Sequence, residues 1–176
     1  DSFRCHMCVL TLLKKGMAKT TRILIPSDFT VDSLHFVRQS IEESMADSID
    51  IILVYGNKSS TSASELLGIG LEDQLETLQS ESFLKACSGI YQRYKNRKLS
   101  IFADILGTDN SHYLQHYLKG QSVNEVIIPR DYTYKKKTRN FFNVAIALRK
   151  VESQIPSTIS FKEQPSIRNR EIGLIE

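Results

Sequence analysis

The chain has no tryptophan, and its 176 residues include only three cysteines, four prolines and eight glycines. A small, odd number of cysteines provides no disulfide framework of the kind that stabilises small secreted domains. No apolar run approaches the roughly 20 residues needed to span a bilayer, and no secretory signal with a clear cleavage site is visible. We therefore expect a reducing, cytoplasmic context and no membrane partner.

A strong excess of one charge is also missing. The chain has 23 basic and 20 acidic residues, a net charge of +3, which does not by itself indicate a nucleic-acid partner. Its composition, 41% apolar and 24% charged, is that of an ordinary globular protein. A chain of this length can form one domain with a sizeable core.

The motifs of several enzyme classes are absent as well, including the nucleophile elbow, the Walker loop and G-x-G-x-x-G. Cys5 and Cys8 flank His6 in a C-x-x-C pattern, but no second pair completes the four ligands of a structural zinc site. His112 and His116 have a spacing that can bind a metal. No acid lies between them as in a zinc protease, and we interpret them as a surface pair. We expect no catalytic residues and no metal site.

What the chain does contain is an alternation of short apolar runs and segments of helical periodicity. The runs predict strands over 23–26, 51–55, 99–106, 126–128 and 155–161, and the periodic segments predict helices over about 30–45, 71–94, 110–118 and 141–151. This alternation predicts an α/β three-layer sandwich with a parallel sheet of about five strands. The expected strand order is 3-2-1-4-5, as in flavodoxin-like and Rossmann-like folds.

The expected domain spans residues 20–161. Residues 1–19 are poorly patterned and are interpreted as an irregular lead, an artefact or part of a longer protein. Residues 162–176 are expected to form a C-terminal tail.

The end of the first predicted strand is the most informative stretch. The run ends at Pro26 and is followed by Ser27, Asp28 and a hydroxyl residue, Thr30, that can cap the next helix. Ligands of such sheets bind at the carboxyl edge where the strand order reverses, here between strands one and four. Asp28 and the loop 129–139 are thus predicted to face one crevice. Asp28 either holds a ribose or adenine there or only caps the helix.

Pro26-Ser27-Asp28-Phe29, together with the element order over roughly 20–161, resembles the universal stress protein family. The resemblance implies a flavodoxin-like domain that is usually a dimer, and many members of the family bind ATP or related adenine nucleotides. It further implies that Asp28 contacts the adenine or ribose end, beside Pro26 and Ser27, and that backbone near Val54 contacts the base.

In nucleotide-binding members, the phosphates lie on a loop after strand four of the form G-x2-G-x9-G-[S/T]. The corresponding positions here are Pro129, Tyr132, Phe142 and Asn143, so every glycine is missing. Glycines let backbone N–H groups approach phosphate oxygens closely, and proline has no N–H. The resemblance therefore supports the fold and argues against a family-type ATP site.

Positive charge takes the place of those glycines. The basic residues are Arg130, Lys135, Lys136, Lys137 and Arg139. Flexible cationic side chains before a helix N-terminus could bind a phosphate or polyanion, with Tyr132 and Tyr134 stacking on a base. The alternative is a solvated basic loop.

Three functions follow as hypotheses. The first is a non-enzymatic stress-response or regulatory domain with a degenerate ATP site and no cofactor. It would act with an unknown protein partner and as a homodimer through the edge strand 155–161. The second is a module for AMP, ATP, a cyclic nucleotide or an anion, using Asp28 and the loop from Pro129 and Arg130 onward. The third is a hydrolase or nucleotidyl-type enzyme, for which the chain supplies no evident catalytic groups.

Overall fold

The computed structural model describes residues 20–58, 70–155 and 158–165. Five strands form one parallel sheet in the order β3-β2-β1-β4-β5. The strands are β1 (Thr20–Pro26), β2 (Ser48–Gly56), β3 (Lys98–Leu106), β4 (Glu125–Pro129) and β5 (Ser160–Gln164). The predicted α/β class and strand order are confirmed.

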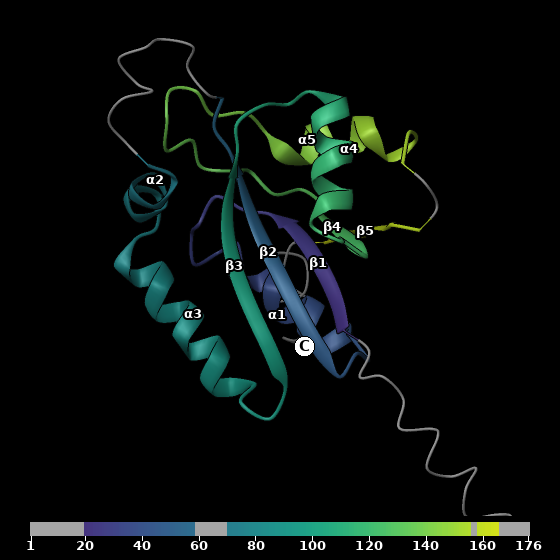
Figure 1. Cartoon of the computed structure of the whole chain (residues 1–176). Coiled ribbons are helices and arrows are strands. Elements are labelled where there is room, and N and C mark those ends of the chain that lie inside the picture. The colour runs from purple at the N-terminus through teal and green to yellow at the C-terminus, as the bar shows by residue number, and fades with distance from the viewer. Residues whose placement is uncertain (1–19, 59–69, 156–157, 166–176) are drawn as a thin grey trace, which may run out of the picture.

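Helices cover both faces of this sheet, which gives three layers (Figure 1). They are α1 (Leu34–Glu43), α2 (Leu71–Leu78), α3 (Glu81–Arg93), α4 (Ser111–Gly120) and α5 (Val144–Glu152). Side chains of α1, α2 and α3 pack in one apolar cluster, and those of α4 and α5 pack in the other.

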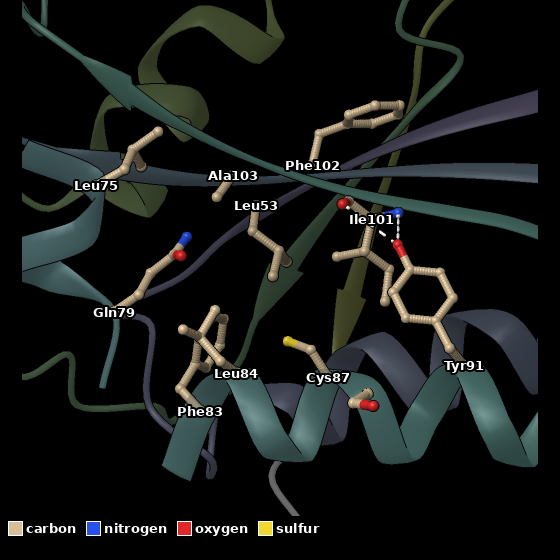
Figure 2. Close-up of a pocket in the computed structure, with 11 residues that line it drawn as sticks. Leu53, Leu75, Gln79, Phe83, Leu84, Cys87, Tyr91, Ile101, Phe102 and Ala103 are labelled. Atoms are coloured by element: carbon tan, nitrogen blue, oxygen red, sulfur yellow. Dashed lines mark hydrogen bonds between the residues drawn. The ribbon is translucent and has the colours of Figure 1, made fainter. Parts of the chain in front are cut away.

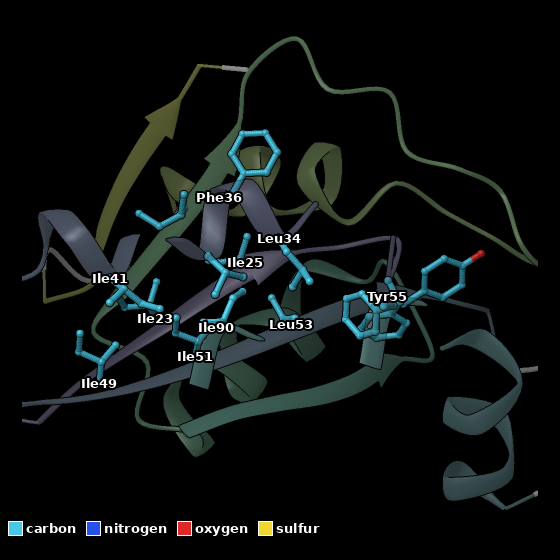
Figure 3. Close-up of a cluster of buried hydrophobic side chains, with 14 of the residues drawn as sticks. Ile23, Ile25, Leu34, Phe36, Ile41, Ile49, Ile51, Leu53, Tyr55 and Ile90 are labelled. Carbon is cyan, nitrogen blue, oxygen red and sulfur yellow. The ribbon is translucent and has the colours of Figure 1, made fainter. Parts of the chain in front are cut away.

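The two clusters arise from strands that are apolar on both sides. Successive residues of a strand point to opposite faces. Ile23 and Ile25 of β1 therefore enter the first cluster, and Leu24 between them enters the second. Figure 3 shows the first cluster, where Ile51 and Leu53 of β2 meet side chains from α1 and α3. Continuous apolar strands are typical of a parallel sheet that helices cover on both faces.

The predicted helix over 71–94 is wrong in one respect, because it is two helices. α2 ends at Leu78, and Ser80 begins a new turn by accepting a hydrogen bond from the Phe83 amide at 3.2 Å. A side-chain cap of this kind satisfies an amide that has no partner inside the helix. Apolar periodicity continued across the break, so the pattern did not reveal it.

The start of α1 also differs from the expectation. Ser33 occupies the N-cap position in place of Thr30. The Thr30 hydroxyl acts one turn earlier, where it donates to Asp28 at 2.7 Å and accepts from the Ser33 amide at 3.4 Å. The turn between β1 and α1 includes Phe29 in a left-handed conformation, with φ of 51°.

The fifth strand lies later than predicted. β5 spans Ser160–Gln164, so the range 155–161 began and ended too early, and residues 162–164 belong to the sheet and not to a tail. Pairing with β4 sets these bounds: Lys162, Glu163 and Gln164 lie opposite Ile127, Ile128 and Pro129. Residues 1–19 and 166–176 lie outside the described part of the chain.

Within the described ranges, no helix has both the length and the apolar character needed to cross a membrane.

Candidate functional site

The predicted site residues meet at the carboxyl edge of the sheet. β1 and β4 are neighbours, and the strand order reverses between them. Ser27, directly after β1, donates its amide to the Val54 carbonyl of β2 at 2.9 Å. Residues 130–143, which we call the β4–α5 loop, return across the same edge and contact Asp28. The fold therefore brings Asp28 and this loop together, as the strand order predicted.

Asp28 is fully buried, and its carboxylate accepts hydrogen bonds from both sides of the crevice. The amide and hydroxyl of Thr30 donate to Oδ1 at 3.2 and 2.7 Å. From the β4–α5 loop, the Tyr132 hydroxyl lies 3.0 Å from both oxygens, and the Lys135 amide donates to Oδ2 at 2.8 Å. A buried carboxylate is stable only with such donors. Asp28 thus joins the turn after β1 to the β4–α5 loop.

Lys137 fastens the same loop at a second point. Its amide donates to the Tyr55 hydroxyl at 3.0 Å, and its ammonium donates to the carbonyls of Phe29 at 2.9 Å and Leu78 at 2.6 Å. Burial lowers the pKa of this lysine, although the nearby Asp28 acts in the opposite direction. Of the five basic residues proposed to bind an anion, Lys137 is the one whose side chain spans the turn after β1 and the end of α2.

The far end of the loop lies against β2 at Gly56. The Phe142 amide donates to the Gly56 carbonyl at 3.1 Å, and the Lys58 amide donates to the Asn140 carbonyl at 2.8 Å. A Cβ on Gly56 would lie 2.3 Å from the Phe142 carbonyl oxygen. Only glycine permits this approach. We did not identify Gly56 from the sequence, where the available signal was a glycine that ends a buried apolar strand.

Tyr132 and Tyr134 pack against the protein's own aromatic rings. Their ring centroids are 4.9 Å apart with the planes at 81°, and Tyr132 meets Phe36 edge-on at 5.4 Å. Burial raises the pKa of both tyrosines. These are the rings for which stacking on a base was predicted, and in the structure they form part of the closed crevice.

The remaining basic residues differ in how they are held. Arg130 donates to Glu163 of β5 at 3.0 and 2.7 Å, and together with Arg149 it lowers the pKa of that carboxyl. Lys135 lies 3.9 Å from Asp32, with both side chains mostly exposed. Lys136 and Arg139 are exposed. The five positions therefore do not converge on a single point.

A separate apolar groove of about 570 Å³ lies between α2, α3 and the strands β2 and β3. Figure 2 shows Cys87 of α3 facing it, beside Leu53 and Ile101. Burial raises the pKa of the Cys87 thiol to about 11, so the thiol stays protonated and unreactive at neutral pH. Neither Asp28 nor any other predicted site residue lines this groove.

No group of three or more histidine, cysteine or acidic side chains suited to a metal ion occurs in the described part of the chain. Cys5 and Cys8 lie outside that part.

No model of a known protein family matches this chain, and no curated protein matches it either. Among solved structures, it is similar to a universal stress protein from Archaeoglobus fulgidus, with 12% identity and a TM-score of 0.48 over 86% of this chain and 98% of that one. It is also similar to a universal stress protein family member from Burkholderia pseudomallei, with 9% identity and a TM-score of 0.47 over 82% of this chain and 96% of that one.

A third similar structure is a universal stress protein family member from Arabidopsis thaliana with AMP bound. It has 9% identity and a TM-score of 0.43, over 85% of this chain and 94% of that one. At these identities the likeness concerns the arrangement of strands and helices, and it is a likeness to universal stress proteins.

Proposed function

We propose that this chain is a non-enzymatic regulatory domain of the universal-stress-protein type, which acts in the stress response through protein contacts and without a bound nucleotide. The observation that carries the proposal is the set of hydrogen bonds between Asp28 and the β4–α5 loop. We also infer a cytoplasmic location from the few, odd-numbered cysteines.

A nucleotide site needs hydrogen-bond donors and acceptors that are free to bind the ligand. At the carboxyl edge of this sheet, several of these groups already bond to other parts of the protein. A ribose or adenine that bound Asp28 would have to displace Tyr132 and the Lys135 amide. A phosphate cradle needs free backbone N–H groups, and several amides of the β4–α5 loop have partners inside the protein. They are those of Arg130 with Gln164, Lys135 with Asp28, Lys137 with Tyr55 and Phe142 with Gly56.

Thermal unfolding with and without nucleotides tests this proposal. ATP, ADP, AMP and cyclic nucleotides, each with magnesium, should leave the unfolding midpoint unchanged. A ligand at 100 times its dissociation constant would add about 2.7 kcal/mol of stability, a readily measured shift. The Arabidopsis thaliana protein with AMP bound provides a positive control in the same assay. Tight, magnesium-dependent ATP binding by this chain would overturn the proposal.

The protein contact that we propose is a homodimer through β5. This strand lies at one edge of the sheet. Ser160 and Gln164 use their backbone groups toward Asn124 and Arg130, so the intervening Phe161 and Glu163 direct theirs outward. Exposed strand edges favour pairing. Sedimentation velocity should show a dimer, and a monomer at high concentration would count against this arrangement.

A second candidate is a module that binds an adenine nucleotide or an anion with Asp28 and the basic residues of the β4–α5 loop. The observation in its favour is the exposure of the Lys135, Lys136 and Arg139 side chains. Their contribution would be electrostatic, so affinity should fall steeply with salt. Replacing Lys136 and Arg139 with alanine should then abolish binding. Binding that is independent of salt would exclude this candidate.

A further inference from the structure

Two histidines lie one turn apart on the exposed face of α4. Nε2 of His112 and Nε2 of His116 are 3.1 Å apart, and the ring planes meet at 84°. When both imidazoles are neutral, this distance is that of a hydrogen bond in which the Nε2–H of one ring donates to the Nε2 lone pair of the other. Both side chains are exposed to solvent. The two nitrogens therefore face each other on a side of the helix that is open to solvent.

The separation of these nitrogens suits a single metal ion. Imidazole nitrogens bind zinc at about 2.0–2.1 Å. At that bond length, nitrogens 3.1 Å apart subtend about 95–102° at the ion. This angle lies between the roughly 90° of square or octahedral complexes and the roughly 109° of tetrahedral ones. An ion could thus bind both nitrogens once the two rings turn from each other toward it, with no change in the helix backbone.

The backbone beneath the pair is held in place. Asn110 caps α4 by accepting from the amides of His112 at 2.9 Å and Tyr113 at 3.2 Å. On the inner face of the helix, Leu114 and Leu118 are fully buried in the second apolar cluster. Ligands on an anchored helix lose little freedom when they bind an ion.

We propose that His112 and His116 chelate one divalent transition-metal ion of the class that prefers imidazole: Cu²⁺, Ni²⁺ or Zn²⁺. Binding requires both rings to carry their remaining proton on Nδ1, so that both Nε2 atoms donate a lone pair. The described residues add no third histidine, cysteine or carboxylate to this pair. Water, or a ligand from another molecule, fills the other coordination positions. This proposal is independent of the proposed function and replaces our expectation of a simple surface pair.

Calorimetric titration of the untagged full chain with Cu²⁺ tests the proposal. All variants carry Cys5→Ser, His6→Ala and Cys8→Ser, so that the C-x-x-C segment contributes no ligand. We expect one ion per chain. His112→Ala and His116→Ala should each weaken binding at least tenfold, and His35→Ala on α1 serves as the matched control with unchanged affinity.

Electron paramagnetic resonance of the Cu²⁺ complex gives a second readout. The spectrum should show coupling to imidazole nitrogens, which is lost in the double variant H112A/H116A. Circular dichroism establishes that this variant remains folded. Equal affinity in the double variant, an equal loss in His35→Ala, or no binding heat in the parent chain would overturn the proposal.

Discussion

Asp28 is the residue on which the closed crevice depends. It is fully buried, and its carboxylate accepts from Thr30, Tyr132 and Lys135. Asp28→Ala leaves the Lys135 amide without its acceptor, whereas the Thr30 and Tyr132 hydroxyls, 3.0 Å apart, can still bond to each other. A buried donor without a partner costs about 1–3 kcal/mol. We expect a loss of this size in the free energy of unfolding, measured with urea.

The matched control for this substitution is Asp32→Ala, in the same turn, where the side chain is 73% exposed. Surface changes of this kind usually stay within about 0.5 kcal/mol. Equal and small effects of the two substitutions would contradict the role that we assign to Asp28.

Gly56 also contributes to the stability of the fold, and its contribution depends only on its lack of a side chain. Gly56→Ala would place a Cβ 2.3 Å from the Phe142 carbonyl, so the β4–α5 loop must move away from β2. We expect a destabilisation of about 1–3 kcal/mol by urea unfolding, as is typical of overpacking. Gly89→Ala, in α3, meets no atom within 4 Å and should instead stabilise by about 1 kcal/mol. Stabilisation by both would be inconsistent with the close approach.

At the scale of elements, side chains occupy some of the backbone hydrogen-bonding groups on the outer edge of β3. The Tyr91 hydroxyl accepts from the Ile101 amide at 2.7 Å and lies 3.4 Å from its carbonyl (Figure 2). The Asp104 carboxylate accepts from the Tyr117 hydroxyl at 2.6 Å and also from the Ile105 amide at 2.8 Å. Side chains that occupy edge groups discourage strand pairing. This contrast favours β5 over β3 as the edge for the homodimer that we propose.

Tyr91→Phe should open the β3 edge. Without the hydroxyl, the Ile101 amide loses its partner, so its hydrogen exchange should become several-fold faster and the protein should self-associate more. Native-state exchange and sedimentation velocity measure these two effects. Tyr113→Phe, on exposed α4, is the control. Unchanged exchange at Ile101 would show that Tyr91 does not protect the edge.

The Tyr134 hydroxyl is a weak point of the β4–α5 loop. It is buried, and no group in the described part of the chain lies within hydrogen-bonding distance of it. A buried polar group without a partner costs about 1–3 kcal/mol. Tyr134→Phe keeps the ring and removes that cost, so we expect a gain of about 1 kcal/mol in unfolding free energy. A loss of stability would mean that the hydroxyl has a partner in solution.

At the scale of the whole molecule, the buried tyrosines set the response to alkaline pH. Burial raises the pKa of Tyr117, Tyr132 and Tyr134 above the ordinary value of 10.0. The folded state thus keeps protons that the unfolded state releases. Their contribution to stability is complete below pH 10 and is lost as pH rises beyond it. Cys87 acts in the same direction from about pH 9, since its pKa is raised from 9.0 to about 11.

Lys137 opposes this trend, because its pKa is lowered from 10.5 and its folded state loses a proton first. Three tyrosines and a thiol outweigh one lysine, so we expect urea midpoints to fall steadily between pH 9 and 11. Tyr134→Phe should make that fall shallower. A flat profile across this range would contradict the burial of these hydroxyls.

Much of the architecture was accessible from the sequence. The alternation of apolar runs and helical periodicity predicted the element order and the order 3-2-1-4-5, because burial on both faces demands apolar strands. That strand order was enough to place Asp28 beside the loop after β4. The missing glycines were also evident, and from them the sequence predicts that no family-type phosphate cradle forms.

Other features depended on contacts between distant segments. Asp28 and Tyr132 are 104 residues apart, and no local pattern indicated that the loop would fold onto the carboxylate. The role of Gly56 depends on where Phe142 lies, and the bounds of β5 depend on pairing with β4. Periodicity records which residues are buried, whereas long-range packing selects the partner of each buried polar group. For this reason the position of the crevice was predictable, and its closure by the chain's own loop was not.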